Sequence, residues 1–173
     1  MGPDATRTTR PVDQSLNDMV ASLAQEAIGK GSTALLDDDM GSFGVPNPRI
    51  LIVGCGGSGN NTLNRITHLG VDGAITVAIN TDKQHLDHTR SLQKLLVGRH
   101  ITRGLGAGGD PSTGRRCAEA GRDMIKRIVT GADLVFIASG LGGGSGTGIC
   151  PIVAEEAKAA GALVVGIVTT PFH

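Results

Sequence analysis

From residue 49 onward, the chain alternates short apolar runs with longer mixed segments. Apolar runs of this length favour strands, and the segments between several of them favour helices. Near-continuous apolar strands that alternate with helices indicate a mostly parallel sheet covered on both faces, which is a doubly wound, Rossmann-like α/β fold. The predicted strands are 49–53, 74–79, 94–97 (the weakest), 134–138 and 163–168, and the predicted helices are 58–69, 152–160 and one from Ser112 or Thr113 to about Thr130.

Residues 1–48 are predicted to form a partly helical, flexible extension, which leaves 49–173 as one domain. Apolar residues recur at helical spacing between 16 and 27, after a possible cap at Ser15, and the remainder is predicted to be linker. Three consecutive aspartates at 37–39 suggest a metal site. An acidic run between linker segments is usually solvated, however, so we predict no metal there.

Fourteen of the 27 glycines fall in three short segments: 54–59 (the first glycine loop), 104–109 (the second) and 140–148 (the third). Each follows a predicted strand, and the carboxyl ends of parallel strands share one edge of a sheet, so the three loops should converge. Glycines let backbone N–H groups approach an anion, and a helix N-terminus adds partial positive charge. The third loop, followed by a helix predicted to begin near Pro151, therefore predicts an anion site with hydroxyl donors at Ser145 and Thr147.

Composition excludes several other functions. Residues 1–48 carry three basic and seven acidic side chains, so the neutral chain has a net charge of +4 from 49 onward, which suits a phosphate better than a long polyanion. Trp and Tyr are absent and only three Phe occur, which disfavours nucleic-acid binding by stacking.

No apolar run approaches 18 residues and the first ten residues are polar, so we predict a soluble, intracellular protein. The three cysteines are predicted to be packed thiols in a reducing compartment.

Two nucleotide chemistries fit the glycine loops. The first loop matches GxGxxG after a strand, and Asp82 lies 23 residues beyond Gly59, which suggests the dinucleotide-binding domain of an NAD-dependent oxidoreductase. That interpretation leaves the other two glycine loops unexplained. A Walker loop is absent, so a triphosphate would be held by backbone amides, helix N-termini and a divalent ion instead of a lysine.

Four motifs in order resemble the nucleotide loops of the tubulin/FtsZ family, and the FtsZ branch, especially its archaeal members, fits best. The resemblance covers residue 49 to the end. It implies a GTPase that binds GTP or GDP with Mg²⁺ and polymerises head to tail, with hydrolysis completed at the subunit interface. It also implies a cytoplasmic protein at the division site, which meets other ring proteins and membrane anchors without entering the membrane. The four are ILIVGCGGSGNN at 50–61, AINTD at 78–82, RGLGAGGDP at 103–111 and VTTPF at 168–172, and they accompany GGGSGTG at 142–148, which looks like the family's signature.

The same resemblance implies which residues bind the nucleotide. Asp82 would lie near the metal or the attacking water, although Asn-Thr-Asp also caps turns. Asn60 or Asn61 would lie near the sugar or base. The implied phosphate contacts are Gly56, Gly57, Ser58, Gly59 and Asn60 in the first glycine loop, Ala107, Gly108 and Gly109 near the γ-phosphate, and Gly144, Ser145, Gly146, Thr147 and Gly148 around the α- and β-phosphates.

Some features depart from the family pattern or compete with it. Ser145 stands where Thr is usual, and Asp110 stands where Asn is common, so its carboxylate would repel the γ-phosphate. The family's guanine-reading helix and hydrolysis-completing loop would follow His173, so we expect weak binding and little turnover from this segment, or a role as a filament cap.

A bulky residue at Gly146 is predicted to abolish nucleotide binding with little loss of fold. His85 and His88 are predicted to lie on a surface helix, and a basic face on the helix after 111 is predicted to be solvated.

Overall fold

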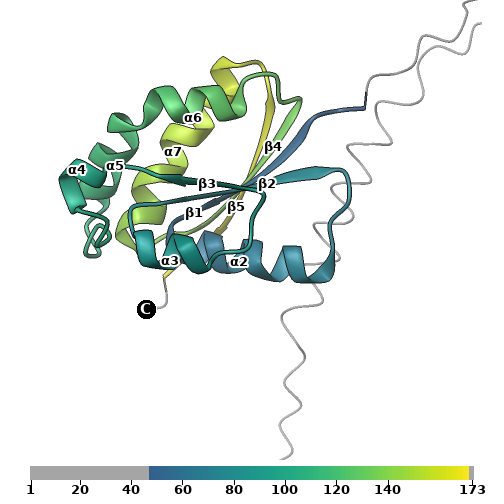
Figure 1. Cartoon of the computed structure of the whole chain (residues 1–173). Coiled ribbons are helices and arrows are strands. Elements are labelled where there is room, and N and C mark those ends of the chain that lie inside the picture. Colours follow the sequence, from purple (N-terminus) through teal and green to yellow (C-terminus); the bar gives the residue numbers. More distant parts are fainter. Residues whose placement is uncertain (1–46, 172–173) are drawn as a thin grey trace, which may run out of the picture. The chain divides into compact units, whose positions relative to one another are not determined.

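The computed structural model describes residues 47–171, and the predictions made above for residues 1–46 lie outside them. Within the described residues the chain forms a five-stranded sheet with strand order β3-β2-β1-β4-β5, in which every neighbouring pair is parallel (Figure 1). The register places the carboxyl ends of β1, β2 and β4 at one edge. The strands are β1 (Ile50–Cys55), β2 (Ala74–Asn80), β3 (Gln93–Leu96), β4 (Leu134–Gly140) and β5 (Leu163–Thr169).

Helices cover both faces of this sheet, as the sequence predicted. Helices α2 (Gly56–Leu69) and α3 (Lys83–His88) lie on one face, and α5 (Pro111–Ala120), α6 (Arg122–Val129) and α7 (Gly144–Ala159) lie on the other (Figure 1). The short helix α4 (Arg99–Thr102) packs beside α5. The fold is therefore a doubly wound α/β domain.

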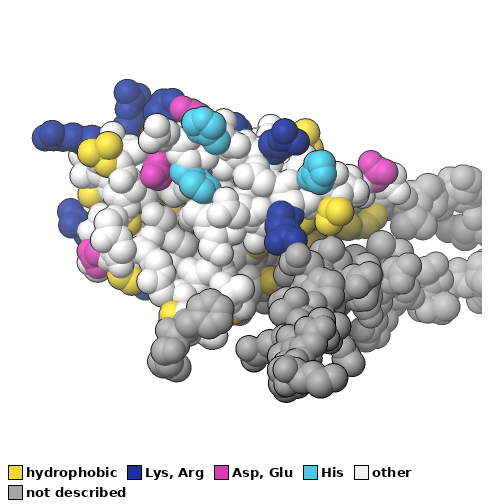
Figure 2. Space-filling view, turned by 90° about the horizontal axis from the view of Figure 1, so that it is seen from below, with side chains coloured by type: hydrophobic (Ala, Val, Ile, Leu, Met, Phe, Trp, Pro, Cys, Tyr) yellow, Lys and Arg dark blue, Asp and Glu magenta, His cyan; other side chains and the backbone are white. Residues whose placement is uncertain are grey.

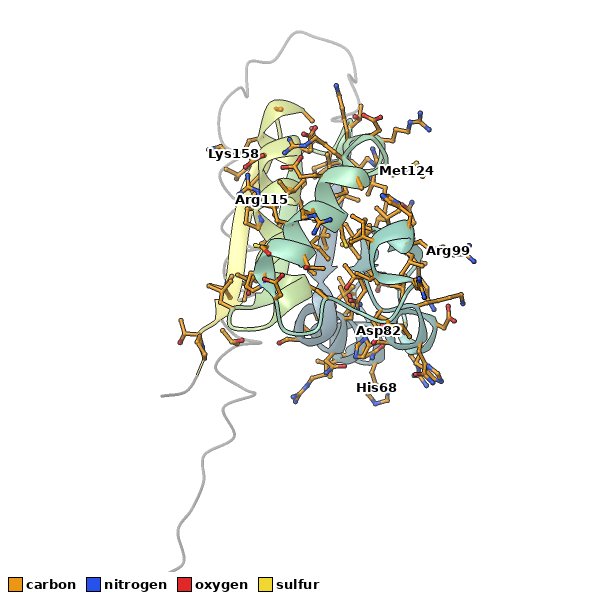
Figure 3. The ribbon with its side chains drawn as sticks, turned by 90° about the vertical axis from the view of Figure 1, so that its left-hand side faces the viewer. His68, Asp82, Arg99, Arg115, Met124 and Lys158 are labelled. Carbon is orange, nitrogen blue, oxygen red and sulfur yellow. The ribbon has the colours of Figure 1, made fainter. Side chains whose placement is uncertain are left out.

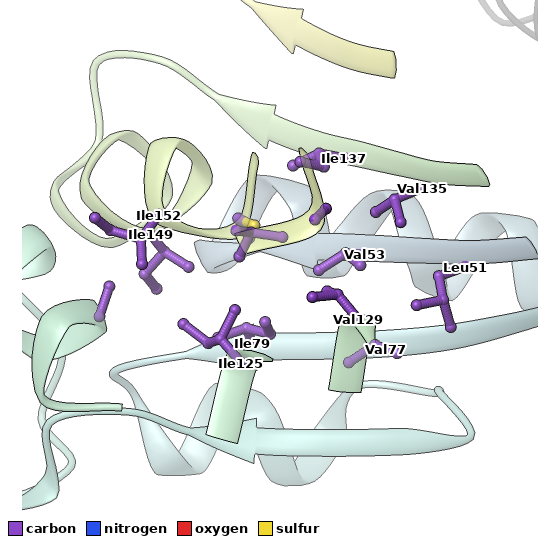
Figure 4. Packing of buried hydrophobic residues seen from close by; sticks show 14 of the residues in the cluster. Leu51, Val53, Val77, Ile79, Ile125, Val129, Val135, Ile137, Ile149 and Ile152 are labelled. Carbon is purple, nitrogen blue, oxygen red and sulfur yellow. The ribbon is translucent and has the colours of Figure 1, made fainter. Parts of the chain in front are cut away.

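Alternation along the central strands explains the two-faced core. In β1, Leu51 and Val53 face α5, α6 and α7, whereas Ile52 faces α2, because successive side chains point to opposite sides of a strand. All three are buried, so β1 reads as a continuous apolar run. The larger cluster fills the space under α6 and α7, as Figure 4 shows for Leu51, Val53, Val77, Ile79, Ile125, Val129, Val135, Ile137, Ile149 and Ile152.

The predicted start of the last helix is wrong. Helix α7 begins at Gly144, and Pro151 lies inside it. Proline is common in a first helical turn, which made Pro151 look like the start, while the glycines before it read as loop. These helical positions are glycines because α7 passes close to its neighbours there. A Cβ on Gly148 would lie 2.3 Å from the backbone nitrogen of Arg115 in α5.

The predicted single helix ending near Thr130 is two helices, which meet at Gly121. Arg122, the first residue of α6, reaches from this junction to both neighbouring helices. Its guanidinium donates to Glu119 in α5 at 2.9 Å and to Glu156 in α7 at 2.6 Å. A further bond at 3.0 Å reaches Glu155. These hydrogen bonds, Glu119 first, raise the pKa of Arg122. Arg122 is thus an ion-pair centre, so the prediction that the whole basic face is solvated fails at this residue.

Candidate functional site

A cleft of about 420 Å³ opens at the carboxyl edge of the sheet. Its walls come from the first glycine loop, from the third glycine loop with the start of α7, and from the end of β5. The first and third loops therefore lie side by side, as the parallel topology predicted. The lining residues are Cys55, Gly57, Ser58, Gly140, Leu141, Gly143, Gly144, Ser145, Gly146, Thr169, Thr170 and Pro171.

Close backbone contact holds the first loop against α7. Gly56 has φ +69°, and a Cβ there would lie 2.5 Å from the backbone nitrogen of Gly146. Gly146 is itself buried, and its Cβ would meet Ser139 Oγ at 2.8 Å and the Cys55 carbonyl oxygen at 3.0 Å. Neighbouring protein atoms therefore leave no room for a side chain at Gly146. This contradicts the prediction that a bulky residue there would block the nucleotide with little loss of fold. A bulky residue there should disturb the fold as well as any ligand.

The second glycine loop packs behind the cleft. A Cβ on Gly144 would lie 2.9 Å from the carbonyl carbon of Gly109 and 3.0 Å from Cβ of Ala107. Ala107 is buried in this contact, whereas Gly108 and Gly109 are exposed. All three loops thus meet at one edge, but Ala107, Gly108 and Gly109 do not line the cleft. Their predicted contact with a γ-phosphate stays a prediction.

Thr81, between β2 and α3, joins these loops. Its Oγ1 lies 2.6 Å from Oγ of Ser145, at the start of α7. Its carbonyl oxygen accepts from the backbone nitrogen of Gly106 at 3.3 Å and from Oγ1 of Thr102 at 3.3 Å. Its own nitrogen donates to Oδ1 of Asn80 at 2.8 Å. The sequence offered only a turn motif here, and Thr81 was not among the predicted site residues.

Asp82 caps α3, which was the alternative that the sequence left open. Its Oδ1 accepts from the backbone nitrogen of His85 at 2.9 Å, and its Oδ2 lies 3.7 Å from where a Cβ of Gly106 would be. Figure 3 shows Asp82 far from Met124 and Lys158, which lie at the opposite end of the domain. Across residues 47–171, no three His, Cys, Asp or Glu side chains gather as a metal site. His85 and His88 lie on α3, as predicted, with separate partners, Asn80 and Gln84.

Asp110 caps α5 instead of Ser112 or Thr113, which corrects the predicted cap. Its carboxylate accepts from the backbone nitrogens and the hydroxyls of both residues at 2.6–3.0 Å. Hydrogen bonds from Thr113 and Ser112 hold the pKa of Asp110 well below its ordinary value. The carboxylate is thus turned onto its own helix, where the N-terminal dipole favours negative charge.

Replacing Asp110 with alanine should lower the melting temperature at pH 7, because α5 loses its cap. A carboxyl whose pKa is depressed in the folded state stabilises above its unfolded pKa of about 4, and this contribution is lost as the pH falls toward the folded value. The difference in melting temperature between the parent and Asp110→Ala should therefore have its maximum value at pH 6 and decrease below about pH 4. Asp110→Asn, which keeps a capping oxygen, is the control. A gap that is constant with pH would contradict this assignment.

Two polar side chains behind the cleft lack partners among the described residues. Asn60 is fully buried and neither atom of its amide is hydrogen-bonded, and Oγ of Ser139 is also unpaired. Asn60 does not line the cleft, so its predicted contact with phosphate, sugar or base stays a prediction. Its neighbour Asn61, the other residue suggested for the sugar or base, is exposed.

The cysteines are packed thiols, as predicted. Cys55 and Cys117 are fully buried and Cys150 is half-buried. Burial raises the pKa of all three thiols, most strongly at Cys55. They are therefore neutral near pH 7, and the helix dipoles near Cys55 and Cys150 do not generate a thiolate.

The outer face of α2 and α3 shows no strong charge of one sign. Figure 2 shows basic, acidic and histidine side chains interspersed on this face. No helix in residues 47–171 combines the length and apolar character needed to cross a bilayer.

Residues 49–173 match the model of the tubulin/FtsZ family, GTPase domain. The chain belongs to the tubulin/FtsZ family. It is 58% identical over 127 residues to cell division protein FtsZ 2 of Halobacterium salinarum, a match that covers 73% of this chain and 32% of that protein. The matched family model is that of a GTPase domain, so the alternative of an NAD-dependent oxidoreductase is not favoured.

Solved family members share the fold. An empty FtsZ dimer from M. jannaschii is 43% identical with a TM-score of 0.72, covering 95% of this chain and 41% of that one. CetZ2 from Haloferax volcanii, solved as a GTPγS-bound protofilament, is 28% identical with a TM-score of 0.56, covering 70% and 39%. The matches thus cover only 32% to 41% of the length of these relatives.

Proposed function

We propose that residues 49–173 form the guanine-nucleotide-binding part of a GTPase that assembles into the cell-division ring, and that residues 1–48 are an extension to it. The observation that carries this proposal is the cleft between the first and third glycine loops. Its walls are backbone amides, hydroxyls and the N-terminus of the 16-residue helix α7, which suit phosphate oxygens. The family match and the GTPγS bound to CetZ2 support a guanine nucleotide.

Gly57, Ser58, Gly144, Ser145 and Gly146 are the predicted site residues that line this cleft, and we propose them as the phosphate contacts. Thr169, Thr170 and Pro171 join them as residues missed in the predicted set, although their VTTPF segment carried part of the resemblance. Thr147 does not line the cleft, and its Oγ1 accepts from the nitrogen of Gly142 at 3.1 Å. Its predicted contact with phosphate stays a prediction.

Mg²⁺ would accompany the bound nucleotide. Asp82 does not line the cleft, but its Oδ2 makes no hydrogen bond within the described residues, and a free carboxylate oxygen suits such a hard cation. Asp82 would hold the ion, and the ion would neutralise phosphate charge. Asp82 itself keeps α3 in place through its other oxygen.

Self-association is the second part of the proposal. The FtsZ dimer and the CetZ2 protofilament are assemblies of relatives, so we propose that this protein polymerises head to tail and completes hydrolysis at the interface between subunits. Its place would be the cytoplasm at the division site, with ring proteins and membrane anchors as further partners. Capping of a filament by this segment is the remaining alternative, and light scattering of a full-length relative with and without the segment distinguishes it, since a cap reduces assembly.

Titration of the chain with a fluorescent GTP analogue and with NAD tests the nucleotide. We expect saturable binding of the GTP analogue, displaced by GDP, and at least tenfold weaker binding of NAD. Binding should weaken as Mg²⁺ is removed, because the phosphates then repel one another and Asp82 without compensation. Binding of NAD without binding of GTP would overturn the proposal.

A further inference from the structure

We propose that Thr81 is a positioning residue that aims the hydroxyl proton of Ser145 into the cleft as a donor to a phosphate oxygen. This inference rests on the proposed function, because it concerns the same cleft. It starts from two hydroxyls 2.6 Å apart that join the segment after β2 to the first turn of α7. Distance alone leaves open which oxygen donates, so the direction must come from the surroundings of each group.

The surroundings of Thr81 fix that direction. Thr81 is fully buried, and within the described residues its Oγ1 makes no other hydrogen bond. If Ser145 donated to Thr81, the Thr81 proton would have no acceptor, and a buried unpaired donor is costly. Thr81 therefore donates and Ser145 accepts.

Ser145 has the opposite surroundings. It is half-buried and lines the cleft, and its hydroxyl makes no hydrogen bond other than that with Thr81 in the described part of the chain. Because its oxygen accepts from Thr81, its own proton is free to point into the cleft. The N-terminus of α7 already favours an anion in the cleft through its partial positive charge. The Ser145 hydroxyl adds a hydrogen-bond donor of fixed direction.

The remaining contacts of Thr81 keep this pair in place. Its backbone carbonyl oxygen accepts from Gly106, and its nitrogen donates to the Asn80 side chain, so Thr81 is held from two sides before any ligand enters. The Ser145 hydroxyl is thus ordered in advance, which removes part of the entropy cost of binding. Thr81 contributes to affinity through Ser145 without contacting the ligand.

The test is a mutant cycle on the chain of 173 residues, with a fluorescent GDP analogue as probe. Thr81→Val keeps the shape and removes the hydroxyl, and should raise Kd roughly ten- to a hundredfold, while Thr81→Ser should stay within about threefold of the parent. In a Ser145→Ala background, Thr81→Val should add less than about twofold, because the hydroxyl that it orients is gone. An equal loss in both backgrounds, or no loss in either, would overturn the proposal.

Thr76→Val is the matched control for loss of a buried threonine hydroxyl. Thr76 Oγ1 accepts from the nitrogen of Leu92 at 3.0 Å, away from the cleft, so this variant should lose stability and keep its Kd. A parent that binds no nucleotide would refute the proposed function. In that case urea unfolding still decides the hydroxyl pairing: Thr81→Val and Ser145→Ala should be non-additive by roughly fivefold in the unfolding equilibrium constant, and additivity would overturn it.

Discussion

Replacing Gly148 with alanine should destabilise the domain by about 3 kcal/mol, although it adds only one methyl group. The new Cβ would lie 2.3 Å from the backbone nitrogen of Arg115, 2.5 Å from the carbonyl carbon of Gly114 and 2.6 Å from the carbonyl oxygen of Pro111. These are backbone atoms of α5, so no side chain can rotate to make room. The two helices must separate, and the gain of about 1 kcal/mol in helix propensity from Gly to Ala is too small to compensate.

Urea unfolding followed by circular dichroism measures this loss. Gly143→Ala is the control, because no atom lies within 4 Å of a Cβ there and its φ is −92°, which any residue adopts. That variant should lose only about 1 kcal/mol, because alanine is a poorer N-cap for α7 than glycine. Equal unfolding midpoints for Gly148→Ala and Gly143→Ala would show that α5 and α7 are not in such close contact.

The layered fold was predictable because its causes are local. Five apolar runs and the polar segments between them sufficed for a doubly wound parallel sheet, and parallel topology alone brought the loops after β1 and β4 to one edge. The order of four glycine and threonine motifs then sufficed for the family. Both inferences depend on composition and spacing along the chain, which the sequence contains directly.

The reason why a given position must be glycine was less predictable, because it depends on which atoms pack against that position in the folded chain. Gly146 was interpreted as leaving room for a phosphate, yet its missing Cβ faces Ser139 Oγ and the Cys55 carbonyl oxygen. Gly148 was likewise assigned to a phosphate contact and packs against α5. A run of glycines in sequence does not reveal which members face a ligand and which face a neighbouring helix.

The contacts of polar side chains were less predictable for a related reason. The carboxylate of Asp110 caps α5, held by four donors from Ser112 and Thr113, whereas its expected repulsion of a phosphate stays a prediction. Aspartate three residues before a helical threonine is a capping pattern, so this signal was present in the sequence. Thr81 gave no such signal, since its partner Ser145 is 64 residues away.

Replacing Gly143 with aspartate should stabilise the fold and abolish nucleotide binding. Gly143 is the N-cap of α7, with φ −92° and ψ 163° and no side chain to accept from the first N–H groups. Aspartate is a favourable cap in this geometry and should add a few tenths of a kcal/mol. The same position lines the cleft, so the carboxylate would occupy the amides proposed for phosphate and repel it. At about 4 Å and an effective dielectric of 20, this repulsion is about 4 kcal/mol, or roughly a thousandfold in Kd.

Gly143→Asn separates charge from capping, because it supplies a similar cap without the negative charge. It should match the melting temperature of Gly143→Asp within about 2 °C and bind the fluorescent GDP analogue at least tenfold more tightly. Raising the salt concentration should recover little affinity for Gly143→Asp, since a contact at this range is screened weakly. Opposite signs in stability and affinity at one residue cannot arise from misfolding. If Gly143→Asp binds as tightly as the parent, the phosphates do not lie at the N-terminus of α7.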